Sequence, residues 1–236
     1  MTAVINFHFY IFAFVLFFLS SCAESNVSAP APVVQEQEEY QYAIKKFGVS
    51  AGAASLAFRE EDLNGQKVPC VVFTAKSLNF FDEEKIYMDP KTFYPTAVKR
   101  DLNIFGKREK IDEYYDHQKG EIKIVKDVKG QKEVRTLQKQ GPIDNLYCFL
   151  YRFRQQPLPK PGTAMTIRLP TKDVRIVFEG EENFKVGREK VKSYVLESDP
   201  SQYKIWLDKG AKRVPLRIDG AMGAISSSLV IKETPR

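Results

Sequence analysis

Apolar residues alternate with polar or small residues along most of the chain after residue 41. Clear examples are the sets Ala54-Leu56-Phe58, Val71-Phe73-Ala75 and Met165-Ile167-Leu169. A period of two places successive side chains on opposite faces of a strand, so that one face is buried and the other meets water. Turn-forming pairs such as Asn64-Gly65 and Lys129-Gly130 separate these sets. We therefore predict a mainly β fold, a curved antiparallel meander that forms an open or half barrel.

One segment, residues 142–153, departs from this period. Ile143, Leu146, Tyr147 and Leu150 recur at helical spacing, and the segment opens with a proline suited to the first helical position. A helix this apolar must be covered by other elements. We therefore predict one short apolar helix over 142–153, packed on the concave face of the sheet.

Aromatic and aliphatic side chains on and near this helix are the candidates for lining a ligand groove. They are Tyr147, Phe149, Leu150, Phe153 and Trp206. Such side chains serve equally well as core, and packing is the alternative for each of them.

The N-terminal region carries an apolar run at residues 7–19, shorter than the roughly twenty residues that a membrane span needs. The next residues, 19–22, read LSSC, and this pattern resembles the lipobox of bacterial lipoprotein signal peptides. The resemblance implies a signal peptide over 1–21, acylation of Cys22 and a membrane attachment through the acyl chains. Ala23 after the cysteine then implies the outer membrane, facing the periplasm.

The alternative is an uncleaved N-terminal anchor, because the first six residues contain no Lys or Arg. Residues 22–40 are rich in Pro, Ala, Ser and Glu, which predicts a disordered tether. The remaining residues, 41–236, are enough for a single β-rich domain.

Charge is unevenly distributed between tether and domain. All 36 Lys and Arg lie after residue 39, and once the four tether glutamates are set aside the domain carries a net charge of +10. Such a domain is attracted to anionic envelope surfaces, although lysines spread over solvent-facing strand positions are the alternative. The export signal argues against nucleic acid as a partner.

The sequence contains few groups of residues that could form a catalytic site. No dinucleotide-binding or Walker pattern is present, and His117 is the single histidine after the signal segment. A metal site or a Ser-His pair would depend on His117 alone, so we expect no metal, no cofactor and no enzymatic activity.

Two cysteines remain after Cys22, namely Cys70 and Cys148. In an oxidising compartment they could form a disulfide, and two buried thiols are the alternative.

Several short motifs carry a family resemblance. Pro142, Ile143, Leu146 and Tyr147 fit the helix motif of a bacterial envelope family known as a domain of unknown function, number 3108. Trp206, Leu207, Pro215 and Gly223 fit its C-terminal strands, so the resemblance spans residues 42–231. It implies a curved antiparallel sheet around a helix, similar to envelope lipid binders built as half barrels, and brings no established activity or ligand.

Two functions are consistent with these observations. The first is a non-enzymatic lipoprotein that binds a hydrophobic or lipid-like envelope component in transport or assembly. The second is an interaction lipoprotein that recruits an envelope protein and has no ligand cavity.

Overall fold

The computed structural model describes residues 37–221 and 227–233, all within one compact unit, Val33–Arg236. The described residues form a single antiparallel sheet and one helix. The strands are β1 (Glu38–Lys46), β2 (Val49–Leu63), β3 (Gln66–Ser77), β4 (Phe80–Met88), β5 (Pro95–Ile104), β6 (Lys107–Asp116), β7 (Glu121–Val128), β8 (Gln131–Gln138), β9 (Ala164–Leu169), β10 (Lys172–Val186), β11 (Glu189–Asp199), β12 (Lys204–Asp208), β13 (Pro215–Asp219) and β14 (Ser227–Ile231), and the helix is α1 (Leu146–Gln155).

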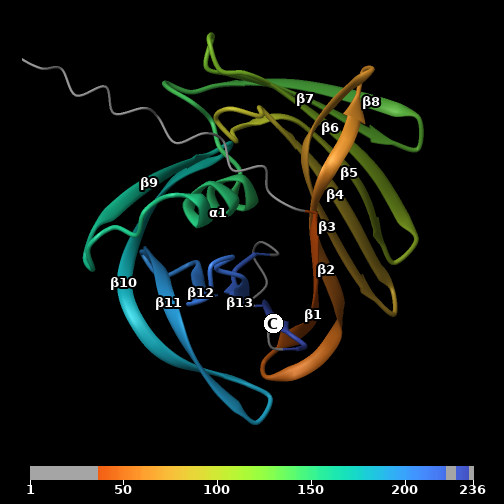
Figure 1. Ribbon diagram of the computed structural model, residues 1–236. Helices are drawn as coiled ribbons and strands as arrows, with labels where there is room; N and C mark the ends of the chain where they lie inside the picture. Colours follow the sequence, from red (N-terminus) through yellow and green to blue (C-terminus); the bar gives the residue numbers. More distant parts are fainter. Residues whose placement is uncertain (1–36, 222–226, 234–236) are drawn as a thin grey trace, which may run out of the picture. The chain divides into compact units, whose positions relative to one another are not determined.

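The sheet consists of two meanders joined by one non-sequential pairing. Strands β1–β8 and β9–β14 each pair with their neighbours in sequence, and β1 pairs antiparallel with β14. Strands β8 and β9 are the two edges, so the sheet is not closed. It curls around α1, as Figure 1 shows. The predicted curved open meander with one short helix is confirmed.

The helix fills the concave side of the sheet. Tyr147 stacks on Phe73 of β3 at 5.2 Å, and Tyr151 stacks on Phe58 of β2 at 5.1 Å. On the other side Phe153 lies 6.1 Å from Phe178 of β10. Because α1 contacts both meanders, it connects them through one continuous core.

The start of the helix differs from the sequence prediction. Residues 142–145 are not helical, and Asn145 is the N-cap, its side chain accepting a hydrogen bond from the Tyr147 amide. The Asp144 amide donates to the Arg168 carbonyl of β9 at 2.7 Å, and the Asp144 carboxylate pairs with Arg152. These contacts hold the preceding segment against β9, which delays the helix by four residues relative to the prediction.

The two cysteines lie in different clusters on the two faces of β3. Cys148 belongs to the concave core, whereas Cys70 packs with Ala57, Val72 and Tyr87 in a small cluster on the convex face. Both thiols are free and buried, so the structure contains two buried thiols at these positions and not the disulfide considered above. Cys22 lies outside the described residues.

A buried ion pair connects the first strand to the helix. Arg154 of α1 contacts both carboxylate oxygens of Glu38 at 2.5 and 3.0 Å, and the two side chains are 1% and 5% exposed. The Arg154 Nε also donates to the Lys212 carbonyl at 2.8 Å. Strand β1 begins at Glu38, three residues before the predicted domain boundary at residue 41.

The substitution Arg154→Met tests this connection. It leaves the Glu38 carboxylate buried without its cation, and we expect the free energy of unfolding to fall by about 3–5 kcal/mol. Urea denaturation monitored by circular dichroism measures the loss. The matched control is Arg175→Met, which breaks an exposed pair with Asp199 and should cost at most about 1 kcal/mol. Equal losses in the two variants would contradict a special role for the buried pair.

Candidate functional site: a groove at one end of the sheet

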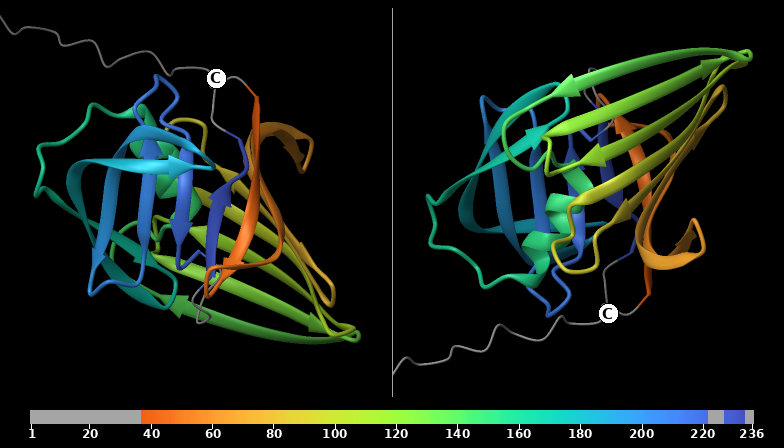
Figure 2. Two further views of the ribbon diagram at one scale, coloured as in Figure 1. Left: turned by 90° about the horizontal axis from the view of Figure 1, so that it is seen from below. Right: turned by 90° about the horizontal axis from the view of Figure 1, so that it is seen from above.

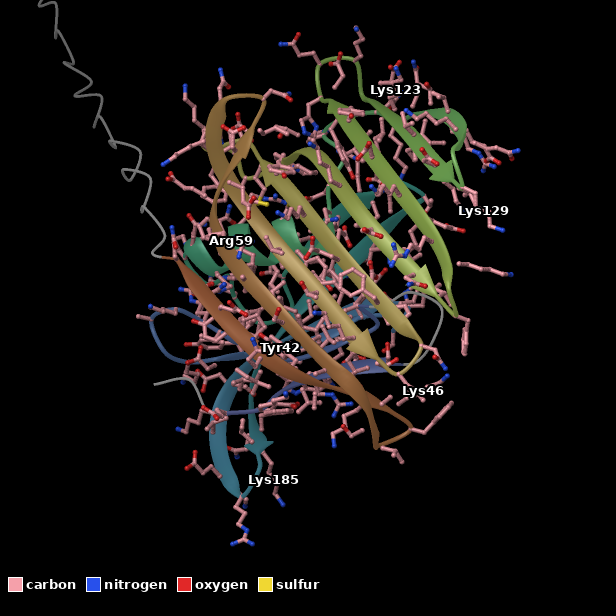
Figure 3. The ribbon with its side chains drawn as sticks, turned by 90° about the vertical axis from the view of Figure 1, so that its right-hand side faces the viewer. Tyr42, Lys46, Arg59, Lys123, Lys129 and Lys185 are labelled. Atoms are coloured by element: carbon pink, nitrogen blue, oxygen red, sulfur yellow. The ribbon has the colours of Figure 1, made fainter. Side chains whose placement is uncertain are left out.

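The antiparallel order places the turns at two ends of the sheet. One end, called here the tip end, carries the turns at 47–48, 78–79, 105–106 and 129–130. The opposite end carries the turns at 64–65, 89–94 and 117–120. Lys46 and Lys129 mark the tip end in Figure 3, and the turns of the β3–β8 hairpins gather there in Figure 2.

The tip end holds an apolar groove of about 380 Å³. Its lining comes from β1, from the ends of three hairpins and from β14: Ile44, Lys46, Ala51, Ser77, Leu78, Asn79, Phe80, Ile104, Phe105 and Ser227. Two of these hairpins are bonded to each other, since the Phe105 amide donates to the Asn79 carbonyl at 2.8 Å. The volume falls within the range of small-molecule sites, about 300–1,000 Å³.

The polar groups of the groove are few. The Lys46 ammonium is exposed at the mouth, and the Ser227 hydroxyl is buried without a hydrogen-bond partner among the described residues. A buried hydroxyl without a partner is costly in a folded protein, so it is an available contact for a polar atom of a ligand.

A charged cluster lies on the concave face of β4–β6. The Arg100 guanidinium binds the Asp82 carboxylate through two hydrogen bonds, of 2.7 and 2.6 Å. Glu84, opposite Arg100 on β4, accepts from Asn145 Nδ2 at 3.2 Å, and Glu113 accepts from the Tyr115 hydroxyl at 2.5 Å.

Burial raises the pKa of Glu84 to about 7, although Arg100 lowers that pKa in part. Burial also raises the pKa of Glu113, against the effect of its hydrogen bond from Tyr115. A carboxyl group that titrates near neutral pH is suited to proton transfer, but no nucleophile or histidine contacts Glu84 among the described residues. The cluster can exchange hydrogen bonds and protons with a polar group.

The sequence-predicted groove residues all lie in the core. Tyr147, Phe149, Leu150, Phe153 and Trp206 are buried in the cluster between the helix and the sheet. The indole N–H of Trp206 donates to Glu182 of β10. None of the five lines the groove at the tip end. Ligand contact by these residues stays a prediction.

Two serine patterns in the sequence resemble catalytic motifs without their structural context. Residues 48–52 read GVSAG, but Ser50 is exposed on β2, just after a hairpin turn and not between a strand and a helix. Residues 201–204 read SQYK, and the Ser201 hydroxyl and the Lys204 ammonium both contact Glu197, at 2.8 and 3.0 Å.

His117 lies at the opposite end of the sheet, where its Nε2 is 2.7 Å from the Pro95 carbonyl oxygen. No group of metal-ligating side chains is present within 37–221 and 227–233. No helix of these two ranges has the length and apolar character needed to cross a membrane.

These features define a class of β-rich protein in which one open antiparallel sheet wraps around a single helix. The chain belongs to the family described as proteins of unknown function, DUF3108, whose model matches residues 40–227. The resemblance noted from the sequence is thereby confirmed. A comparison with curated proteins found no match.

The raised pKa of Glu84 predicts a pH-dependent effect of Glu84→Gln. A carboxyl group whose pKa rises on folding contributes most to stability below its ordinary pKa of 4.5, and this contribution is lost as the pH rises through about 7. Glutamine mimics the protonated form, so the variant should match the parent near pH 4.5 and be more stable at pH 8. Urea denaturation across this range measures the difference. Glu83→Gln, one residue away on the other face of β4, controls for the loss of one negative charge, and parallel pH profiles for parent and Glu84→Gln would contradict the prediction.

Proposed function

We propose that the protein is a membrane-anchored envelope lipoprotein, without enzymatic activity, that binds the hydrocarbon part of a lipid-like envelope component in the groove at the tip end. The observation that carries this proposal is the groove itself, an open apolar site with one cation at its mouth and one unpartnered hydroxyl. An amphiphile with an anionic head and an apolar chain has the matching chemistry.

Side chains fill the interior between the helix and the sheet. This supports a ligand in the groove at the tip end over a ligand beside the helix, the location expected from the sequence. Leu150 and Phe153 are buried between the helix and the sheet, and the aromatic contacts of α1 reach both meanders. A ligand there would have to displace the core, at a cost of several kcal/mol for each large side chain moved. The groove requires no such displacement.

The lipobox at residues 19–22 and the basic domain support the proposed address. Acylation at Cys22 would hold the domain at the outer membrane, on the periplasmic side.

A second candidate function, the recruitment of an envelope protein, is favoured by the edge strand β8. Residues 131–136 of β8 all pair with β7 and are all exposed, and no strand of the described residues pairs with the other edge of β8. An unpaired edge can accept an added strand from a partner. Photocrosslinking in cells from Val134 would identify such a partner.

The substitution Ala51→Trp tests the groove. An indole at this lining position should occupy the space of the ligand and weaken binding of dansyl-undecanoic acid by tenfold or more, whereas the parent protein should bind it saturably and release it to palmitate. Fluorescence titration of the purified full chain gives both affinities. Native mass spectrometry of the same samples should show co-purifying lipid with the parent and less with the variant.

The matched control is Thr136→Trp, which adds an exposed indole on β8 outside the groove and should bind the dansyl probe like the parent. Absence of saturable binding by the parent, together with a crosslinked partner at Val134, would favour the recruitment function instead.

A further inference from the structure

Three neighbouring hairpins at the tip end expose large apolar side chains. Phe47, Leu78 and Phe105 occupy the turns of the β1–β2, β3–β4 and β5–β6 hairpins and are 83%, 97% and 77% exposed. Because β1–β6 are consecutive in the sheet, the three turns form one row. Exposed apolar side chains gathered in one place indicate an interaction surface.

Two of these turns carry backbone strain that the fold does not need. Phe47 and Phe105 have φ values of 52° and 50°, each followed by a glycine that also has positive φ. This turn type favours Asn or Asp at its first position, and a bulky residue there is a clear outlier. The β2–β3 hairpin of this protein has Asn64-Gly65 in the same turn. The sequence therefore keeps a strained, exposed phenylalanine where asparagine would fold more easily.

The charges around these turns all have one sign. Residues 45–50, 76–81 and 103–108 contain five cations and no Asp or Glu; the cations are Lys45, Lys46, Lys76, Lys107 and Arg108. Four of the five are exposed, and Lys45 is partly buried. Aromatic rings and aliphatic side chains beside lysine and arginine are typical of protein surfaces that enter the headgroup region of a bilayer.

The turns at the opposite end have the contrasting chemistry. Asp62, Asp89 and Asp116 each begin a turn there and accept hydrogen bonds from backbone amides two or three residues later. The fourth turn at the tip end follows this ordinary pattern, since Asp127 accepts from the Gly130 amide at 2.8 Å. Among these four turns at the tip end, large exposed apolar side chains are thus confined to the three neighbouring hairpins, whereas the fourth turn carries Lys129.

We propose that these three turns dock on an anionic phospholipid bilayer. Phe47, Leu78 and Phe105 insert among the headgroups, and the five cations contact lipid phosphates. The groove is lined by two of the same residues, Leu78 and Phe105, so docking places its mouth at the membrane surface. The docking goes beyond the proposed ligand binding and does not require it.

The N-terminal attachment is compatible with this orientation. Strand β1 begins at the opposite end, and the sixteen-residue step from Cys22 to Glu38 can span at most about 55 Å when extended. The longest strands, of 15 residues, measure about 50 Å. A chain anchored near Cys22 can therefore reach Glu38 while the tip end faces the same membrane.

A matched pair of fluorescent labels tests the docking. The full chain is reconstituted in vesicles of phosphatidylcholine with 30 mol% phosphatidylglycerol, and an NBD label is attached at Asn79→Cys or at Asn64→Cys. Both asparagines lie in two-residue hairpin turns, one at each end of the sheet. Cys70 and Cys148 are buried, and the unsubstituted chain measures background labelling.

We expect the label at residue 79 to shift its emission to shorter wavelength and to be quenched at least twofold by brominated acyl chains. The label at residue 64 should show neither effect. Omitting phosphatidylglycerol, or raising the salt to 1 M, should reduce the quenching because the cations act through screened charge. Equal quenching at both positions, or none at residue 79, would overturn the proposal. A label shielded only after a protein extract is added would assign the surface to a protein partner and equally overturn it.

Two variants separate docking from folding and from ligand binding. Phe47→Asn, which leaves the lining of the groove unchanged, should reduce the quenching at residue 79 at least twofold while raising Tm by about 2–4 °C. A lowered Tm would assign the ring a structural role and contradict the proposal. Ala51→Trp, which fills the groove, should lose binding of the dansyl probe while brominated acyl chains still quench the label at residue 79 at least twofold, so that failure of ligand binding and failure of docking remain distinguishable.

Discussion

The packing of one apolar helix against both meanders is the constraint on which the rest of the structure depends. The open sheet has two free edges, β8 and β9, and the chain passes from one edge to the other through α1. Tyr147 and Tyr151 contact β3 and β2, and Phe153 contacts β10. Because one helix supplies the buried surface for both meanders, neither can bury its concave face without it. The curvature of the sheet follows from the need to cover the helix.

This arrangement divides the concave side into a filled region and an open one. Where α1 lies, aromatic side chains occupy the interior, and two ion pairs hold the last turn of the helix: Arg152 with Asp144 of the preceding segment, and Arg154 with Glu38 of β1. Beyond the helix, toward the tip end, Phe80 is only partly buried and Ile104 is exposed, and both line the groove. A short helix under a sheet of long strands therefore leaves an apolar surface at the end that it does not reach.

The sequence was sufficient to predict the sheet and the existence of the helix, because both are encoded by local periodicity. The start of the helix was not predictable, since the Asp144 amide is held by the Arg168 carbonyl, which is distant in sequence, and the Asp144 carboxylate by Arg152. The groove was missed for a related reason: its lining comes together only through the pairing of β1–β6 with one another and of β1 with β14. A local signal was nevertheless present, because Phe47-Gly48 and Phe105-Gly106 interrupt the alternation, although phenylalanine is not a typical turn residue.

The two ends of the sheet show how turn chemistry can separate folding from interaction. At the opposite end, Asp62, Asp89 and Asp116 satisfy backbone amides, so these turns stabilise the hairpins they close. At the tip end, Phe47 and Phe105 contribute strain and largely exposed rings. The hairpins tolerate this strain because their register is already fixed by long ladders and by the core around α1. A rigid sheet can therefore hold destabilising apolar side chains at its tip end. Only contact with an apolar environment outside the molecule would compensate for the exposure of these side chains to water.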